Sequence, residues 1–134
     1  MSKSKAINTS GSRKMSVARL TLMPGQGLVR INGRLLDTYE PKLARMKLQE
    51  PLLLVGDLAS KVHIEATVSG GGVMSQVDAI RQAMGRAFAE LGGEKVKRAL
   101  LDYDRSLLVA DTRFKEQRKP NDSKARAKRQ KSYR

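Results

Sequence analysis

The sequence contains a run of three glycines, Gly70-Gly71-Gly72, that could bind a phosphate group. The run lies between an alternating stretch that predicts a strand and a periodic stretch that predicts a helix. Backbone N–H groups of such a turn, together with the N-terminus of the following helix, can bind phosphate. Neither the Lys-Ser/Thr pair of a Walker loop nor the spacing G-x-G-x-x-G accompanies the run. A tight structural turn explains the glycines equally well, so both interpretations stay open, and an RNA phosphate suits the charge of the chain better than a nucleotide does.

Few other residues could act in catalysis. The one histidine, His63, lies on the polar side of the alternating stretch, where solvent or RNA is the expected neighbour. Asp102, Asp104 and Asp111 lie close together in the sequence, but Arg105 and Arg113 beside them favour ion pairing and capping. The chain has no cysteine, so it can form neither a disulfide nor a thiolate zinc site. We therefore predict a protein that is not an enzyme and uses no cofactor or metal.

The basic residues are concentrated at the two ends of the chain. The formal net charge is +14, from 27 Lys and Arg against 13 Asp and Glu. Residues 1–36 hold seven basic residues and no acid, residues 37–111 are nearly neutral, and residues 112–134 hold ten basic residues and two acids. The segment 124–134 has no aliphatic side chain larger than alanine, so it cannot bury enough apolar surface to fold alone. Basic ends on a neutral centre favour a nucleic-acid partner.

The same distribution predicts three parts: a basic N-terminal arm at 1–14, a globular α+β body at 15–111 and an extended basic RNA-binding tail at 112–134. No apolar run approaches the roughly 18 residues that span a membrane, and the first residues do not resemble a signal peptide. The tail lacks the lipidation site or apolar face of a polybasic membrane anchor. We expect a cytoplasmic protein without a membrane partner.

Four stretches predict strands, at residues 16–23, 28–31, 34–36 and 62–69. The first two are expected to form a hairpin through Pro24-Gly25-Gln26-Gly27. Residues 1–14 are polar and are predicted to be extended rather than part of the sheet.

Three helices are predicted, at residues 42–49, 73–91 and 94–103, the last two separated by Gly92-Gly93. In the first helix we expect Leu43 and Met46 to face the core, and Pro51 to begin a separate short turn. The other helices carry apolar stripes: Val73, Val77, Ile80, Met84, Phe88 and Leu91 in one, and Val96, Leu100 and Tyr103 in the other. The run 107–110 is expected to dock on the body. The order β-β-β-α-β-α-α predicts a two-layer α+β sandwich with helices on one face of a sheet.

Seven segments together form a recognisable pattern: 9–19 (TSGSRKMSVAR), 29–33 (VRING), 50–54 (EPLLL), 68–72 (VSGGG), 79–83 (AIRQA), 102–111 (DYDRSLLVAD) and 125–134 (ARAKRQKSYR). In these segments the chain resembles the family of the universal ninth protein of the small ribosomal subunit. The ending Lys-Ser-Tyr-Arg is similar to the archaeal–eukaryotic branch, and the short, cysteine-free chain is more similar to its archaeal than to its eukaryotic members. Two departures are visible, Asp111-Thr112-Arg113 where the family commonly has Asp-Pro-Arg, and Asn121-Asp122 where it commonly has glycines.

The resemblance implies a fold close to the second domain of small-subunit ribosomal protein five, with a left-handed β-α-β crossover. It implies a structural role in translation, with rRNA of the subunit head and neighbouring head proteins as partners. It also implies that the tail reaches the anticodon stem-loop of the peptidyl-site tRNA through Lys131, Ser132, Tyr133 and Arg134. The candidate rRNA-binding residues are Arg13, Lys14, Arg19, Gly70, Gly71, Gly72, Gln76, Arg113, Arg118, Lys119, Lys124, Arg126, Lys128 and Arg129.

Two alternatives stay open, the first also an RNA-binding protein and the second from another class. A free-standing RNA-binding protein or chaperone would purify without ribosomes. A phosphotransferase would use the glycine turn, but no metal-binding carboxylate pair accompanies that turn.

Overall fold

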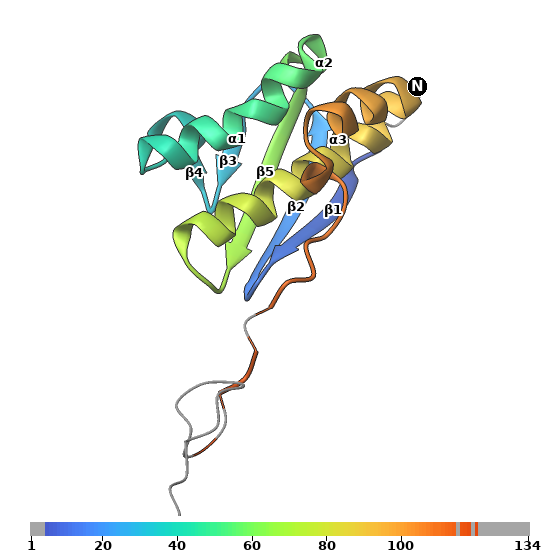
Figure 1. Cartoon of the computed structure of the whole chain (residues 1–134). Helices are drawn as coiled ribbons and strands as arrows, with labels where there is room; N and C mark the ends of the chain where they lie inside the picture. Colours follow the sequence, from blue (N-terminus) through green and yellow to red (C-terminus); the bar gives the residue numbers. More distant parts are fainter. Residues whose placement is uncertain (1–4, 115, 119, 121–134) are drawn as a thin grey trace, which may run out of the picture.

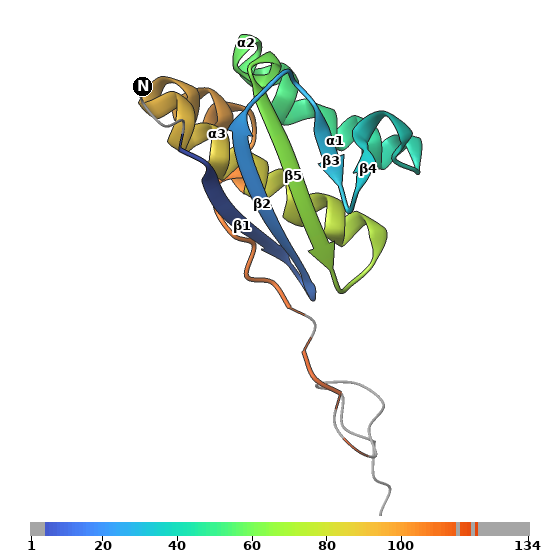
Figure 2. The ribbon, with the colours of Figure 1, turned by 180° about the vertical axis from the view of Figure 1, so that it is seen from behind.

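The computed structural model describes residues 5–114, 116–118 and 120. Helices cover one face of a five-stranded sheet, and the other face carries no helix (Figure 1, and from behind in Figure 2). The order of strands across the sheet is β1-β2-β5-β3-β4. The strands are β1 (Ile7–Arg13), β2 (Ser16–Pro24), β3 (Val29–Ile31), β4 (Arg34–Leu35) and β5 (Val62–Ser69). The expected two-layer α+β architecture is confirmed.

The N-terminal segment differs from the expectation, because residues 7–13 form an edge strand and not an arm. β1 pairs antiparallel with β2 from Ile7 opposite Leu22 to Arg13 opposite Ser16. β1 is mostly polar, so its sequence lacks the apolar alternation that predicts a strand. The strand forms because it packs closely against α3 (Val73–Tyr103). A Cβ added at Gly11 would collide with the carbonyl oxygen of Ala79, so glycine is what lets this strand lie against the helix.

The expected hairpin between residues 16–23 and 28–31 is wrong. β2 and β3 do not pair; β5 lies between them, antiparallel to β2 and parallel to β3. The apolar side chains of β5 (Val62, Ile64, Ala66 and Val68) are all buried on one face, and the helices cover that face best when β5 lies inside the sheet. In Figure 1 the helices face the viewer, β3 and β5 run downward, and β5 lies to the right of β3. The connection through α1 (Lys42–Val55) is therefore the expected left-handed crossover.

The first helix is longer than expected and faces the other way. α1 continues through Pro51, whose ring is buried, to Val55, and the short α2 (Asp57–Ser60) follows. The core-facing residues are Ala44, Leu48 and Pro51. Leu43 and Met46, which we expected inside, are 60% and 53% exposed.

The long helix α3 follows the predicted stripe and the predicted break. Gly93 has φ 74° and ψ −160°, so two helical segments meet there at a kink. Val77, Ile80, Met84, Phe88 and Leu100 are fully buried. The ends of the stripes differ from the expectation, because Val73, Leu91 and Tyr103 are 49%, 40% and 54% exposed.

The segment after α3 returns to the body, as expected. The 3-10 turn η2 (Arg105–Leu107) buries Leu107 completely. The backbone of Leu107 lies so close to Gly85 that a side chain at position 85 would collide with it.

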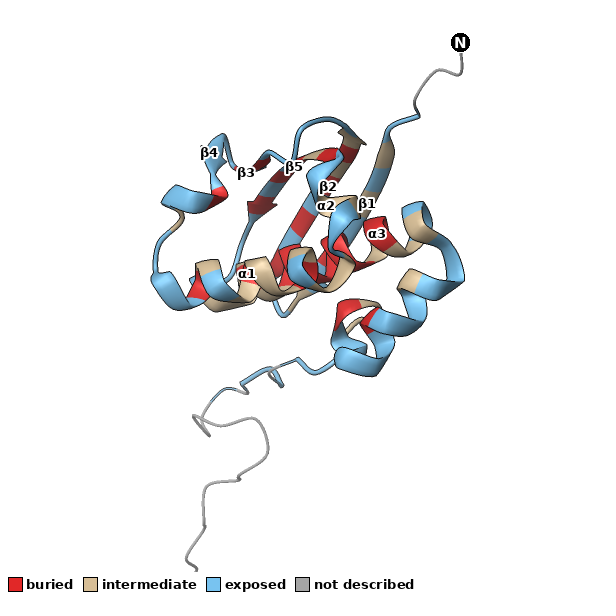
Figure 3. Cartoon of the chain, turned by 90° about the horizontal axis from the view of Figure 1, so that it is seen from above, coloured by how far each residue is buried: buried red, intermediate tan, exposed pale blue. Residues whose placement is uncertain are grey.

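Figure 3 shows buried residues where the helices meet the sheet. In the described part of the chain no helix is long and apolar enough to cross a membrane.

Candidate nucleic-acid interface

The first two glycines of the turn after β5 have structural roles. Gly70 and Gly71 have φ of 79° and 64°, in the left-handed region that favours glycine. A Cβ at Gly71 would collide with Ser16 Oγ, and one at Gly70 with the carbonyl oxygen of Met15. Ser16 Oγ donates a hydrogen bond of 2.8 Å to the carbonyl oxygen of Gly70. These contacts join the turn to the β1–β2 hairpin, as the interpretation of a tight turn requires.

The third glycine is placed differently. Gly72 is the N-cap of α3, and no heavy atom lies within 4 Å of the position its Cβ would take. It offers no capping side chain, so the first N–H groups of α3 have no acceptor from the cap residue. Gln76, one of the candidate rRNA-binding residues, donates through Nε2 to the carbonyl oxygen of Gly70 at 3.1 Å. Gly72 and the start of α3 are therefore the open part of the turn, and Gln76 stabilises it.

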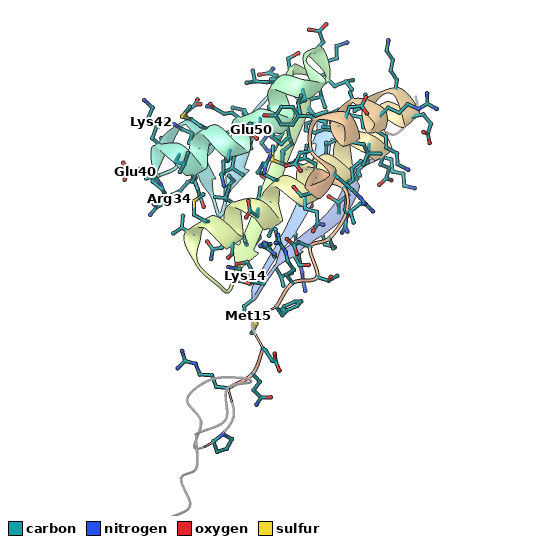
Figure 4. The ribbon with its side chains drawn as sticks, in the orientation of Figure 1. Lys14, Met15, Arg34, Glu40, Lys42 and Glu50 are labelled. Carbon is teal, nitrogen blue, oxygen red and sulfur yellow. The ribbon has the colours of Figure 1, made fainter. Side chains whose placement is uncertain are left out.

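The β1–β2 hairpin ends beside this turn. Lys14 has φ 53° at the hairpin tip, and Met15 is 75% exposed. Figure 4 places both residues at the end of the molecule from which the chain runs on after η2. The hairpin tip and the glycine turn thus form one surface with the point where the C-terminal segment leaves the body.

Asp111 attaches that segment to the hairpin. Arg13 Nη1 lies 2.7 Å from Asp111 Oδ2, and Arg113 Nη2 lies 2.7 Å from the same oxygen. Arg113 also donates to Asp111 through Nε and through its backbone N–H. The hydrogen bonds from Arg113 are the main reason that the pKa of Asp111 is lowered far below its usual value. The side chain of Arg113 is nevertheless 83% exposed, whereas that of Arg13 is 19% exposed.

Arg19 lies on the helix-free face of the sheet, because it is exposed between the buried Ala18 and Leu20 on β2. Its neighbours across the strands are Ser10 on β1 and Thr67 on β5. It is exposed and two residues along β2 from Val17, which pairs with Ser69 near the glycine turn. Arg118 is also exposed. The candidate residues Lys119, Lys124, Arg126, Lys128, Arg129, Lys131, Ser132, Tyr133 and Arg134 lie outside the described residues.

Two residues that the sequence did not single out hold β1 in place. Gln82 Oε1 accepts a hydrogen bond from the Ser12 N–H at 2.9 Å, and Arg86 Nη1 donates to the Ser10 carbonyl at 2.9 Å. They cap the outer backbone edge of β1, which has no neighbouring strand. The signal available in the sequence was that Gln82 and Arg86 are polar, lie four residues apart and so share one face of a helix that is otherwise largely apolar there.

Arg81 joins three elements. Its guanidinium Nη2 lies 2.7 Å from Glu50 Oε2 on α1 and 3.6 Å from Asp104 Oδ2 after α3. Asp104 also accepts from the N–H and hydroxyl of Ser106. Burial alone would raise the pKa of Asp104, but these hydrogen bonds and the charge of Arg81 lower it. The expected capping role of Asp104 and ion pairing of Asp111 are both confirmed.

His63, the histidine considered for catalysis, is paired with a carboxylate on the surface of the sheet. His63 Nε2 lies 3.2 Å from Glu65 Oε1, and both residues are on the side of β5 opposite its buried residues, which is the face of the sheet that carries no helix. Within residues 5–114, 116–118 and 120, no group of three or more His, Cys, Asp or Glu residues could bind a metal ion.

Comparison with known proteins assigns the class. Residues 11–134 match the family model described as "Ribosomal protein S9/S16". Similar proteins include the small ribosomal subunit protein uS9 of Methanococcus maripaludis strain C7, 46% identical over 133 residues, covering 97% of this chain and 99% of the relative. The uS9 protein of Methanothrix thermoacetophila is 47% identical over 131 residues, again with 97% and 99% coverage.

These matches identify a ribosomal protein with a structural role, and not an enzyme. The chain belongs to the ribosomal protein S9/S16 family, in its archaeal-type branch. The family is one of structural constituents of the small ribosomal subunit, so the phosphotransferase alternative is excluded.

Proposed function

We propose that this protein binds rRNA in the head of the small ribosomal subunit through one end of its body and through its C-terminal tail. The observation that supports the proposal is the convergence of three segments far apart in the sequence. Met15 and Ser16 at the hairpin contact the glycine turn, and Arg13 of the same hairpin is paired with Asp111, where the tail begins. Asp111 directly precedes residues 112–134, which contain ten Lys or Arg. The start of this basic tail is therefore attached beside the hairpin tip.

The chemistry of this end suits a phosphate backbone. Arg113 extends from Asp111 with an exposed guanidinium, which can contact phosphate oxygens with two parallel N–H groups. Lys14 adds a point charge at the tip, and the uncapped start of α3 at Gly72 supplies backbone N–H donors. None of these groups reads bases, so binding is to backbone shape and charge.

The tail supplies the second part of the proposal. Residues 112–134 form a separate RNA-binding extension, and Lys131 to Arg134 contact the anticodon stem-loop of the peptidyl-site tRNA. The ribosomes concerned are cytoplasmic, and proteins of the subunit head are the expected neighbours. The support is the charge of the tail and the family of the chain.

Deletion of residues 131–134 tests the tRNA contact. The body and the cations from Arg113 to Arg129 remain, so the variant is expected to assemble into subunits normally. Peptidyl-site tRNA affinity is expected to fall roughly three- to thirtyfold, because one ordered charge-assisted contact contributes about 1.5–3 kcal/mol and less when solvated. Filter binding of tRNA to purified subunits at low magnesium measures the change.

The matched control replaces Ser132 and Tyr133 by alanine and keeps both terminal cations. This variant should lose less affinity than the deletion if phosphate contacts dominate. Equal tRNA affinity of deleted and wild-type subunits would refute the tRNA contact. Failure of the full-length protein to sediment with small subunits in high salt would favour the free-standing RNA-binding alternative.

A further inference from the structure

The surface opposite β1 carries an apolar groove between α1 and the β3–β4 edge. Its volume is about 460 Å³, and its lining includes Leu28, Leu35, Leu36, Leu52, Leu53 and Asp37. Leu28, Leu35 and Leu53 are 45%, 41% and 80% exposed. An exposed apolar surface of this kind is typical of an interface with another macromolecule.

The outward side of α1 extends the groove. Met46 lies seven residues before Leu53, so the two share a helix face, and Leu43 lies one turn before Met46. Met46 is 53% exposed and Leu43 is 60% exposed. α1 therefore presents large apolar side chains to solvent as well as to the core, which a helix with no outer partner does not need.

The chemistry of the groove argues against RNA as the occupant. One residue in five of the chain is Lys or Arg, yet none of the residues lining the groove is basic. RNA binding depends on cations at the phosphates or aromatic side chains at the bases, and the lining has neither. The charged residue in the lining is Asp37, whose carboxylate makes no ion pair with any described residue. Arg45 on α1, outside the lining, donates through Nη1 to the backbone carbonyl oxygen of Asp37 at 3.0 Å, so the carboxylate itself stays available to a cation of the partner.

The termini of the chain are unsuitable occupants too. Residues 121–134 contain no Leu, Ile, Val, Met or Phe that could fill an apolar groove. Residues 1–4 precede β1, and β1 and β4 are the opposite edges of the sheet (Figures 1 and 2).

We propose that this groove docks an apolar segment of a second protein of the small subunit, with a Lys or Arg of that segment beside Asp37. The inference rests on the proposed place of the chain in the subunit and adds the surface and the chemistry of the partner. Leu53 and Met46 supply the apolar contact, and Asp37 favours a basic sequence over an acidic one.

Site-specific photo-crosslinking in intact subunits tests the proposal. A photoreactive benzophenone side chain is placed at position 53, and at position 15 in a second preparation. We expect position 53 to crosslink to another ribosomal protein, at a peptide with large apolar residues and a Lys or Arg. Position 15, at the proposed RNA-facing tip, should crosslink to rRNA.

The two positions separate the two proposals. A position 53 crosslink to rRNA, to a second copy of this chain or to nothing overturns the docking groove, whatever position 15 gives. No rRNA crosslink from position 15 counts against the proposed RNA interface instead. If neither labelled protein sediments with small subunits, both proposals fail.

A substitution pair measures the strength of docking. Leu53→Asp should lower retention of the crosslinked partner in salt-washed subunits by about tenfold or more, because it removes a large apolar contact. Leu91→Asp, the same change at an exposed position away from the groove, is the control and should leave retention unchanged. Asp37→Lys should weaken retention and Asp37→Asn should weaken it less. Unchanged retention in Leu53→Asp would overturn the proposal.

Discussion

At the scale of single residues, the three glycines of the turn do different things. Gly71 has a left-handed φ and lies against Ser16, while Gly72 has φ −97° and open space around it. The first is required by the fold, and the second is available to a ligand. The strand-to-helix turn and the candidate phosphate site therefore coexist in one segment.

This difference predicts unequal losses of stability for two alanine variants. Gly71→Ala should lower the free energy of unfolding by about 1–3 kcal/mol, the usual cost of a non-glycine residue in this backbone region. Gly72→Ala should lower it by only about 0.5–1 kcal/mol, because alanine is a poorer N-cap than glycine but meets no clash at this position. Urea denaturation of the isolated protein measures both. Gly72→Val should stay folded and bind rRNA more weakly in a filter assay; normal binding would remove Gly72 from the interface.

Asp111 predicts a dependence on pH. A carboxyl group whose pKa is lowered by folding stabilises the native state at pH values above its unfolded pKa, about 3.9, and this contribution is lost as the pH falls below that value. Asp111→Asn should therefore be less stable than wild type at pH 7, and the difference should shrink below about pH 4. Urea midpoints at both pH values, with Asp102→Asn as the exposed control, check this expectation. A difference independent of pH would contradict it.

At the scale of elements, β1 and the segment after α3 are attached to α3 by polar side chains. Arg86 Nε donates to the Leu108 carbonyl at 3.3 Å, in addition to its bond with β1. Arg81 pairs with Glu50 on α1. The polar side chains of α3 therefore contact β1, the segment after α3 and α1. The segments next to the candidate nucleic-acid interface are thus held by the buried Arg81 and the half-buried Arg86.

Removing Arg81 tests this arrangement. Arg81 is 8% exposed, and both partner carboxylates are 36% exposed. Breaking a fully buried pair costs about 3–5 kcal/mol, and partial hydration of the carboxylates lowers the expected loss for Arg81→Ala to about 1–3 kcal/mol. Arg98→Ala, an exposed cation on the same helix, should cost less than about 0.5 kcal/mol. Equal urea midpoints for the two variants would contradict a structural role for Arg81.

At the scale of the whole molecule, the neutral body and the basic tail should contribute separately to RNA binding. Deleting residues 112–134 removes ten cations but leaves Asp111 paired with Arg13. Each phosphate that the truncated protein no longer neutralises should make the slope of log K against log salt shallower by about 0.7 to 0.9. Filter binding to small-subunit rRNA between low and moderate salt measures the slope. A slope that does not change on truncation would show that the body makes the main electrostatic contacts.

The sequence alone determined the features that depend on neighbours along the chain. The alternation of residues 62–69 predicted β5, the spacing from Val77 to Phe88 predicted the buried face of α3, and Gly93 predicted its break. The charge of the ends and the lack of catalytic groups predicted a nucleic-acid-binding protein that is not an enzyme. These signals are local, because periodicity and composition are written in consecutive residues.

The tertiary structure decided everything that depends on which elements meet. β1 is polar and becomes a strand because Gly11 lets it lie on α3, whose Gln82 and Arg86 complete its hydrogen bonds. Leu43 and Met46 turned outward because the buried residues of α1 are Ala44, Leu48 and Pro51. The pairing of Arg13 with Asp111 joins residues 98 positions apart. No periodicity encodes such contacts, since the free energy that selects them comes from burial and charge between distant segments.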